Sequence, residues 1–395
     1  MKIFHLGDLH IGKLVNGFSM IDDQRFVLNQ LYSNIDIEKP DIIIIAGDIF
    51  DRSIPNIDAV ELADEMFIKI AIDRQIPLIA IAGNHDGKER IDYLSKFAEK
   101  NNLYLRGIVE KEIKPIFFKG ETKDIAIYPI PYAKPALIRE LFEDESIKDH
   151  DDSMHKIIRE IEKKLDRNKI NIAIAHGHVS TINADGVSEL EESKSEKPLE
   201  IGGTDVIDAS YFDVFDYTAL GHLHAPQKVK SNKIRYSGSL LKYSFSEVNQ
   251  KKGITVVELD KDGGVSTQII EFKPRRNMRI IRGELNDILN QDISCEESNQ
   301  DYIRVELEDD LALIDPISKI RGIYPNIMEL GRAVNKDDNN IERKKTASNI
   351  KDKTSLTLFQ EFYLEVTGKE CETNKLDIMK KIIGEVESEV EGNAN

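Results

Sequence analysis

Hydrophobic residues in the first quarter of the chain follow two alternating spacings, one typical of strands and one of helices. Apolar runs that predict buried strands cover residues 2–6, 41–48 and 77–86, and apolar residues at helical spacing cover 22–36, 57–73 and 91–100. The run at 41–48 contains four consecutive isoleucines, as expected of a strand that is covered on both faces. This alternation predicts an α/β fold.

Strand patterns dominate the next part of the chain. They cover residues 113–118, 124–130, 170–176, 217–221, 233–237, 253–259 and 265–272. A helical pattern at about 151–166 interrupts them. Together with the first part, they predict a domain at residues 1–274 in which two sheets pack face to face with helices outside.

The pattern restarts on a smaller scale after residue 274. Strand and helix spacings alternate over residues 275–333, which predicts a compact β-α-β-α-β cap domain. Residues 334–353 are nearly devoid of large apolar side chains and are typical of a flexible linker. Helical spacing returns at 354–391, where two amphipathic helices are expected on either side of Gly368.

Composition favours a globular cytoplasmic protein with no membrane span. Of the 395 residues, 40% are hydrophobic and 32% are charged. No apolar run approaches the ~18 residues that a membrane-spanning helix needs, and the N-terminus reads as a strand rather than a signal peptide. Cys295 and Cys371 are far apart and form no CxxC pair, which argues against a disulfide framework and against a cysteine zinc site.

The net charge of −17 is unusual for a protein that holds nucleic acid, because phosphate contacts normally require Lys and Arg. Divalent cations would reverse the local sign inside a site, and a partner protein could supply most of the DNA affinity. The charge therefore argues against tight DNA binding by this chain alone, but not against phosphodiester chemistry.

Five polar clusters each follow a predicted strand. Strand ends in an α/β sheet converge on one crevice, so side chains far apart in sequence are expected to meet there. Asp-x-His and His-x-His also place two side chains on the same face of an extended segment. The clusters are Asp8 and His10 in GDLH, Asp48, Asp51 and Arg52 in GDIFDR, Asn84 and His85 in GNHD, His176 and His178 in HGH, and His222 and His224 in GHLH. Of the other histidines, His5 is expected to be structural, and His150 and His155 to face solvent on an acidic helix.

The side chains in these clusters combine carboxylates, imidazoles and one amide, without thiolates. That mixture suits Mn²⁺, Fe²⁺ or Zn²⁺ better than the oxygen-preferring Ca²⁺ or Mg²⁺. The ligands are too many for one ion, and two ions about 3.5–4 Å apart need a shared carboxylate. Asp48, at the end of the central apolar run, is the natural bridge, so the sequence predicts a two-metal hydrolase centre.

The same clusters resemble the phosphoesterase motifs of the calcineurin-like metallophosphoesterases, in which GNHD with GHLH is a specific combination. GDLHIGK, DYTALGHLHAPQ (216–227) and YSGSLLKYSFSE (236–247) resemble more narrowly the SbcD-type nucleases. Leu241 departs from that pattern, which has proline there, but removes no ligand. The resemblance implies an α-β-β-α metallophosphoesterase sandwich.

The resemblance also implies residue roles. One ion would take Asp8, His10, Asp48 and His224, and the other would take Asp48, Asn84, His176 and His222. His85 would face the scissile phosphate and assist departure of the leaving group, with the Asp51 carboxylate as its orienting partner. Arg52 would either contact a phosphate or form a structural ion pair. His178 is expected to support the site or lie at the surface rather than to bind an ion.

The resemblance further implies manganese, 3′ to 5′ exonuclease action on duplex ends, endonuclease action on single strands and hairpins, a homodimer, and a coiled-coil ATPase partner of the SbcC type. The C-terminal helices would then dock on the coiled coil through two apolar stripes; ordinary packing of a helical hairpin is the alternative. The stripes are Phe359, Phe362 and Tyr363, and Met379, Ile382 and Ile383. Apolar residues on more than one face of 57–73 and 91–100 favour the homodimer.

Two other functions compete with the nuclease. A phosphatase or nucleotide phosphodiesterase would share GDIFDR and GNHD, which do not distinguish the substrates. A non-catalytic scaffold that tethers an ATPase to DNA would not need the complete ligand set that the sequence retains.

Overall fold

The computed structural model divides the chain into two compact units, which are described separately below. The first contains Met1–Ile280, Asp292–Arg304 and Ile320–Glu329, and the second contains Ile281–Gln291, Val305–Lys319 and Leu330–Asn395. The structure describes residues 1–120, 122–183, 186–187, 190–196, 199, 205–260, 263–290, 298–309, 313–333, 354–367 and 370–392.

The first sheet of the first unit has six strands, and its central strands are parallel. Strand β1 pairs in parallel with β4, β4 with β5, and β5 with β6, while β17 pairs antiparallel with both β1 and β18. The order across the sheet is β18 (Val265–Glu271), β17 (Gly253–Leu259), β1 (Lys2–Leu6), β4 (Ile42–Ile45), β5 (Leu78–Ile81) and β6 (Leu103–Arg106).

The second sheet also has six strands. Strands β8, β9, β14 and β16 are parallel to one another, and the edge strands β7 and β15 are antiparallel to β8 and β16. The order is β15 (Gln227–Lys228), β16 (Ile234–Tyr236), β14 (Tyr217–Gly221), β9 (Ile170–His176), β8 (Ile125–Ile130) and β7 (Ile116–Phe118).

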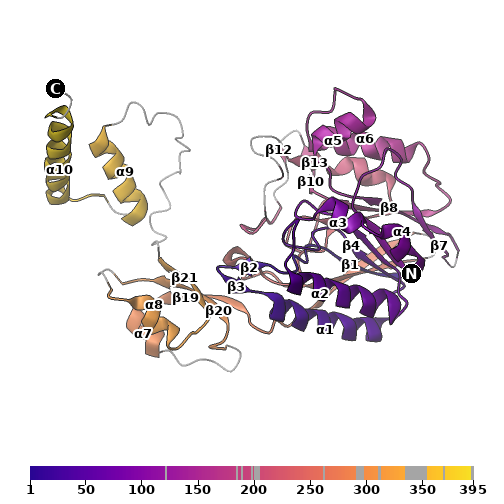
Figure 1. Cartoon of the computed structure of the whole chain (residues 1–395), viewed down its shortest axis with the longest axis horizontal. Coiled ribbons are helices and arrows are strands. Elements are labelled where there is room, and N and C mark those ends of the chain that lie inside the picture. The colour runs from indigo at the N-terminus through magenta and orange to yellow at the C-terminus, as the bar shows by residue number, and fades with distance from the viewer. Residues whose placement is uncertain are drawn as a thin grey trace. The chain divides into compact units, whose positions relative to one another are not determined.

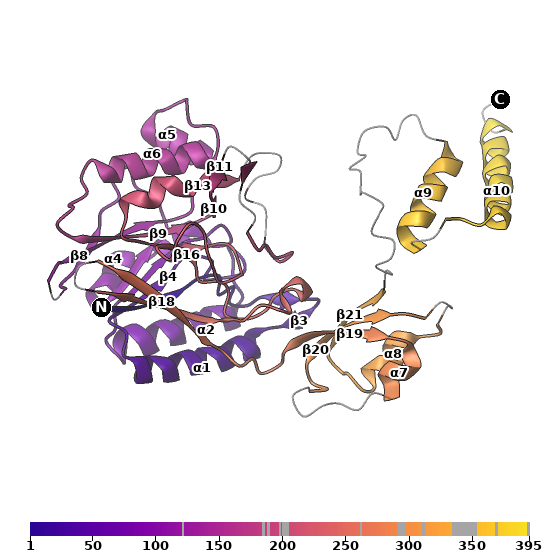
Figure 2. The same ribbon diagram turned by 180° about the vertical axis from the view of Figure 1, so that it is seen from behind.

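Helices cover the outer faces of the two sheets. Helices α1 (Ile21–Glu38) and α2 (Ile57–Phe67) pack on the first sheet, and α5 (Pro135–Phe142) and α6 (His150–Glu162) pack on the second (Figures 1 and 2). Strand β4 shows why: Ile43 and Ile45 pack with the helices, whereas Ile42 and Ile44 point into the apolar layer between the sheets. Full burial of each isoleucine contributes about 1.5–3 kcal/mol. The predicted α-β-β-α sandwich is confirmed.

Two predicted helices differ in detail. The helix expected at 57–73 changes after Phe67 into a π-helical segment, Ile68–Ile72. The helix expected at 91–100 is split into α3 (Lys88–Asp92) and α4 (Ser95–Ala98), because Leu94 has a left-handed backbone with φ of 58°, which cannot continue a right-handed helix. Smaller strands are β2 (Leu14–Val15), β3 (Phe18–Ser19), β10 (His178–Ser180), β11 (Ile182–Asn183), β12 (Gly186–Val187) and β13 (Val206–Asp208).

A three-stranded sheet follows the sandwich along the chain. The elements occur in the order β19 (Met278–Gly283), α7 (Leu285–Asn290), β20 (Tyr302–Leu307), α8 (Pro316–Arg321) and β21 (Ile327–Arg332), with β20 between the other two strands. This is the β-α-β-α-β order that the spacing predicts. The boundary between the two units falls within these three strands.

The C-terminal segment forms two helices, α9 (Ser355–Thr367) and α10 (Thr373–Gly392). Lys375 at the start of α10 donates a hydrogen bond of 2.9 Å to the Tyr363 hydroxyl of α9, and the rings of Phe359 and Tyr363 lie 6.0 Å apart. The predicted linker 334–353 lies outside the described residues. Among the helices that the structure does describe, none has both the length and the apolar character that a bilayer span requires.

Candidate metal centre

The five polar clusters come together at one end of the sandwich. Asp8, Asp48 and Asn84 follow β1, β4 and β5, which are adjacent parallel strands of the first sheet. His176 ends β9 and His222 follows β14, which are adjacent parallel strands of the second sheet. Carboxyl ends of parallel strands share one edge, so both sheets deliver polar side chains to the same place.

Several residues in this centre adopt a backbone that L-amino acids avoid. The φ angles of Asp8, His10, Asp48 and His222 are 52°, 45°, 51° and 112°. Such conformations cost about 1–3 kcal/mol each and persist where surrounding contacts enforce them. Here the first two loops are paired, because the Asp8 amide donates to the Gly47 carbonyl and the His10 amide to the Asp48 carbonyl.

Two glycines leave room for the side chains of the centre. A Cβ atom on Gly47 would lie 2.4 Å from Nδ1 of His176, and one on Gly83 would lie 2.2 Å from Oδ1 of Asp48. Gly47 also has a φ of 90°, which favours glycine. Both positions therefore need glycine for the functional side chains to approach the backbone this closely.

The first group of side chains is formed by Asp8, His10 and His224, whose nearest ligand atoms lie within 4.8 Å of one another. Nε2 of His10 lies 3.0 Å from Nε2 of His224, so the two imidazoles face the same point. All three side chains are buried. A carboxylate and two imidazole nitrogens that converge in this way are a ligand set for a divalent transition metal.

The second group is formed by Asp8, Asp48 and His176, again within 4.8 Å. Nδ1 of His176 donates its proton to the Ala46 carbonyl, which can only accept. In a neutral imidazole Nε2 then carries a lone pair, and it faces the Asn84 amide oxygen at 2.9 Å and Asp48 Oδ2 at 3.5 Å. A cation among these lone pairs is the arrangement that satisfies all of them, so the residues fit a bound metal ion.

The Asp48 carboxylate, a member of the second group, also faces His10 of the first group. Its Oδ2 is 3.7 Å from Nε2 of His10 and 3.5 Å from Nε2 of His176, while Oδ1 accepts a 2.8 Å hydrogen bond from the His85 amide. One oxygen therefore faces both imidazoles, and the other fixes the orientation of the carboxylate. This is the geometry expected of a carboxylate shared by two ions.

Burial sets the charge states of the centre. It raises the pKa of Asp8, and the neighbouring Asp48 carboxylate raises it further. It lowers the pKa of His10 and of His222, and lowers that of His176 to about 4, so the imidazoles stay neutral and keep a lone pair at neutral pH. Burial thus disfavours the negative charge of Asp8, and a divalent cation beside it would favour the ionised carboxylate.

His85 lies beside this centre and is held through both its main chain and its ring. Its Nδ1 is 2.8 Å from the main-chain carbonyl of Asp51, and its Nε2 is 4.0 Å from Asp48 Oδ2. We expected the Asp51 carboxylate to orient His85. The residue is right but the atom is wrong, because the main-chain oxygen of Asp51 contacts the ring. The Asp51 carboxylate instead binds the Lys13 ammonium at 2.7 Å and lies 3.7 Å from Nδ1 of His10.

Three residues that the sequence assigned to the site lie outside the two groups of converging ligand atoms. The Arg52 side chain is 68% exposed, and its Nε lies 3.7 Å from Asp51 Oδ2. The His222 amide donates to both carboxylate oxygens of Asp8, and its ring centroid lies 5.5 Å from that of His176. His178 lies 3.6 Å from Glu192, and its ring centroid is 6.4 Å from that of His222.

Two histidines outside the clusters are buried within the fold. Both ring nitrogens of His5 have partners in the Tyr217 hydroxyl and the Leu220 carbonyl, which agrees with a structural role. His150 is buried and stacks on Tyr132, so the expectation that it faces solvent is wrong. It is the first residue of α6 and packs on a residue far away in the sequence, which the acidic composition of its neighbours did not reveal.

Sequence reasoning assigned no role to three buried charged residues near the centre. Asp86 accepts hydrogen bonds from the amides of Ile49, Phe50 and Gly83, and so ties the second and third loops together. Lys13 pairs with Asp51, and Glu247 lies 3.3 Å from Nδ1 of His224. Their motifs, GNHD, GDLHIGK and YSFSE, were recognisable, but their contacts are between distant parts of the sequence.

Comparisons with known proteins identify the family of the chain. Residues 1–226 match the calcineurin-like phosphoesterase family, and residues 274–367 match the family described as the type 5 capsule protein repressor C-terminal domain. The chain is 34% identical over 383 residues to the SbcD subunit of the nuclease SbcCD of Staphylococcus epidermidis (strain ATCC 12228 / FDA PCI 1200), covering 97% of this chain and 98% of that protein.

Among solved structures, the calcineurin-like phosphoesterase YfkN from Bacillus subtilis is similar at 11% identity with a TM-score of 0.32, over 68% of this chain and 88% of that one. The family assignment rests on the sequence matches and on the arrangement of the two sheets and their polar loops. The chain belongs to the calcineurin-like phosphoesterase family and is a homologue of SbcD, a subunit of the SbcCD nuclease.

Proposed function

We propose that this protein is a two-metal-dependent DNA nuclease that works with an SbcC-type ATPase in cytoplasmic DNA repair and recombination. It would act as a 3′ to 5′ exonuclease on duplex ends and as an endonuclease on single strands and hairpins. The observation that carries the proposal is the Asp48 carboxylate, which belongs to the second group of buried ligand atoms and whose Oδ2 also faces His10 of the first group. The homology to the SbcD subunit of the nuclease SbcCD supports DNA as the substrate.

We assign the ligands to two ions, with manganese as the proposed metal because the set mixes carboxylates, imidazoles and an amide. One ion would be held by Asp8, His10, Asp48 and His224, and the other by Asp48, Asn84, His176 and His222. When bound, such a pair of ions activates a water molecule and stabilises charge on the phosphate during an in-line displacement.

The chain's own residues would then position the phosphodiester and handle its leaving group. His85 has its Nδ1 fixed by the Asp51 carbonyl, and its Nε2, which lies 4.0 Å from Asp48 Oδ2, is the nitrogen that we propose acts on the leaving oxygen. The exposed Arg52 guanidinium at the rim can form two parallel hydrogen bonds to a phosphate, which a Lys could not. We therefore propose that His85 assists departure of the leaving group and that Arg52 contacts a phosphate. Asp51 acts indirectly, through the carbonyl that holds His85.

An apolar surface on the first unit supports the proposed homodimer. Ile57 on α2 is 76% exposed and Phe97 on α4 is 67% exposed, and Tyr93 and Leu94 between α3 and α4 are exposed as well. An exposed apolar patch on helices that already bury their other faces is typical of a protein interface. We propose that a second copy of the chain covers it.

The two C-terminal helices support the proposed ATPase contact. Phe362 on α9 is 61% exposed, and Ile378 and Ile382 on α10 are also exposed. The two packed helices thus leave some of their apolar side chains exposed. We propose that these side chains dock on the coiled coil of an SbcC-type ATPase, which would also supply much of the DNA affinity that a chain with a net charge of −17 lacks.

Cleavage of a DNA hairpin by the purified full-length chain, with and without the ATPase, tests this function. We expect Mn²⁺-dependent cutting that EDTA abolishes. A chromogenic phosphodiester and phosphomonoester run in parallel separate a nuclease from a phosphatase. Turnover of the monoester alone would contradict the nuclease, and DNA binding without any cutting at saturating Mn²⁺ would favour the non-catalytic scaffold.

A further inference from the structure

The imidazole of His224 is held on the side away from the proposed metal ion by residues that have no assigned role. Its Nδ1 lies 2.7 Å from the hydroxyl of Ser195 and 3.3 Å from Oε1 of Glu247. Ser195 belongs to the segment 190–196, which precedes β13, and Glu247 ends the motif YSFSE. Two distant parts of the sequence therefore meet behind one ligand.

Counting protons along this chain of contacts fixes the tautomer of His224. Ser195 Oγ is 2.6 Å from Glu247 Oε1, and since a carboxylate only accepts, the single hydroxyl proton of Ser195 lies on that contact. With its proton used in this way, Ser195 Oγ can only accept a hydrogen bond from His224. Nδ1 of His224 therefore carries the imidazole proton. Nε2 is left with a lone pair, and it is this nitrogen that lies 3.0 Å from Nε2 of His10.

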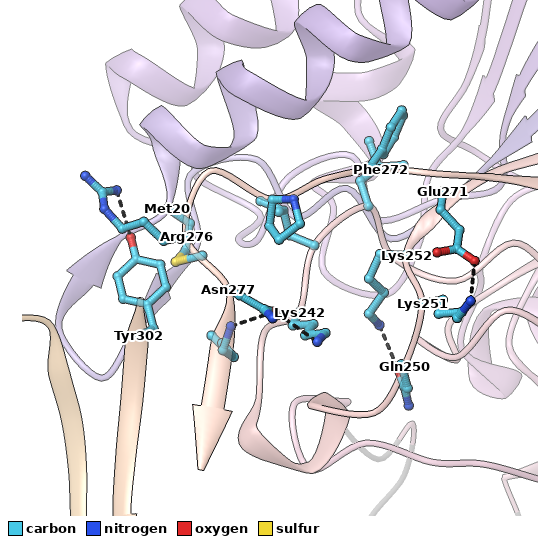
Figure 3. Close-up of a pocket in the computed structure, with 14 residues that line it drawn as sticks. Met20, Lys242, Gln250, Lys251, Lys252, Glu271, Phe272, Arg276, Asn277 and Tyr302 are labelled. Carbon is cyan, nitrogen blue, oxygen red and sulfur yellow. Dashed lines mark hydrogen bonds and ion pairs between the residues drawn. The ribbon is translucent and has the colours of Figure 1, made fainter. Parts of the chain in front are cut away.

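Glu247 is itself fixed inside the protein. It is fully buried, and its Oε2 pairs with the Lys252 ammonium at 2.7 Å while Oε1 also accepts from Ser193 Oγ at 2.6 Å. Lys252 lies on the wall of a pocket of about 180 Å³ and donates there to Gln250 (Figure 3). A buried carboxylate with this many partners has one position, so the Ser195 hydroxyl is held in one orientation too.

The main chain of His224 is clamped by the same two segments. Its amide donates to Oε1 of Glu196 at 2.6 Å, and its carbonyl accepts from the Lys252 ammonium at 2.8 Å. The ring, the amide and the carbonyl of a single residue are therefore all held by side chains from 195–196 and 247–252.

We propose that Ser195 is a positioning residue: its hydroxyl donates to the Glu247 carboxylate and accepts from His224 Nδ1. These two hydrogen bonds would keep His224 Nε2 turned toward the metal ion of the His10 group. The segment 190–196 is thereby part of the metal centre, although it contributes no ligand. The proposal rests on the two-metal site of the proposed function. Partners that orient a metal-binding imidazole typically change metal affinity by about 10- to 100-fold when they are removed.

Mn²⁺ titration of metal-free full-length protein, with free Mn²⁺ measured by electron paramagnetic resonance, tests the proposal without an activity assay. Ser195→Ala should weaken one of the two ions about 10-fold or more and leave the other unchanged. Ser195→Thr keeps the hydroxyl and should restore the affinity. Ser246→Ala is the matched control, because Ser246 contacts Ser193 and Lys194 of the same segment.

The outcomes separate this proposal from the proposed function. If the unaltered protein binds two ions and Ser195→Ala binds both with unchanged affinity, the positioning role is refuted and the two-metal site stands. Failure of Ser195→Thr to restore affinity, or an equal loss in Ser246→Ala, would also refute it, since the effect would then come from docking of the segment. If the unaltered protein binds no Mn²⁺, both proposals fall.

Discussion

Replacing Asp48 with Asn tests the shared-carboxylate geometry most directly. Asn is nearly the same size and keeps an oxygen that can accept the 2.8 Å hydrogen bond from the His85 amide, so the loop should hold its shape. What changes is the negative charge between Nε2 of His10 and Nε2 of His176, which lie 3.7 and 3.5 Å from Oδ2. The variant therefore removes charge with little change of packing.

The expected magnitude follows from the loss of one negative charge next to the proposed ions. One unit charge about 4 Å from another contributes about 4 kcal/mol at an effective dielectric constant near 20. Since about 1.4 kcal/mol corresponds to a tenfold change in rate, losing this interaction at the transition state predicts a fall of about 10³-fold or more. Both ions should also bind more weakly, because both groups face the same oxygen.

The assay is Mn²⁺-dependent cleavage of a DNA hairpin by the full-length chain, measured over a range of Mn²⁺ concentrations. Asp41→Asn is a matched control, because Asp41 is exposed and immediately precedes the same strand, β4, at the end away from the metal centre. Near-normal cleavage by Asp48→Asn at ordinary Mn²⁺ would refute the two-metal assignment. An equal loss in Asp41→Asn would point to damage of the strand instead.

Four further predictions concern the leaving group, the metals and the two interfaces. His85→Ala should keep two ions per chain but lose about 10²–10⁴-fold in rate, and loss of an ion by elemental analysis would make His85 a ligand instead. Removing the ions should lower the thermal midpoint, since ligand at 100 times its Kd stabilises a fold by about 2.7 kcal/mol; an unchanged midpoint would argue against ions bridging the buried carboxylates. Phe97→Glu should shift the particle mass from dimer toward monomer in light scattering, whereas an unaltered chain that is monomeric at micromolar concentration would contradict the interface. Phe359→Glu with Phe362→Glu should abolish co-purification with the ATPase while the free chain still cuts DNA; a partner that still binds would place the docking site elsewhere.

Much of the catalytic fold could be predicted from sequence because its signals are local. The isoleucine run of β4 alternates between two apolar layers, and every strand that carries a polar cluster has a short apolar run of its own. The ligand types follow those runs directly in the chain. The break at Leu94 was missed because its apolar neighbours have helical spacing, and spacing does not report a single left-handed residue.

The contacts between clusters were much less predictable. Asp51 was expected to orient His85 through its carboxylate, yet its carbonyl does so, and the carboxylate pairs with Lys13 from another loop. Which atom of a residue faces a neighbour depends on backbone angles and on side chains far along the chain. A motif gives the residue type and its neighbours in sequence. It gives neither the backbone angles nor the distant side chains that pack against it.

The two-sheet fold and the ligand types at the strand ends could be predicted from short segments, because periodicity and side-chain chemistry are local properties. Two other features exist only in the folded chain: Asp48 Oδ2 faces both His10 and His176, and Ser195 and Glu247 contact Nδ1 of His224. Ser195 lies in a polar loop with no local signal, 29 positions from the imidazole it contacts. Such pairings exist only once both sheets and their loops have packed, because burial then forces each polar group to find a partner from whichever segment lies beside it.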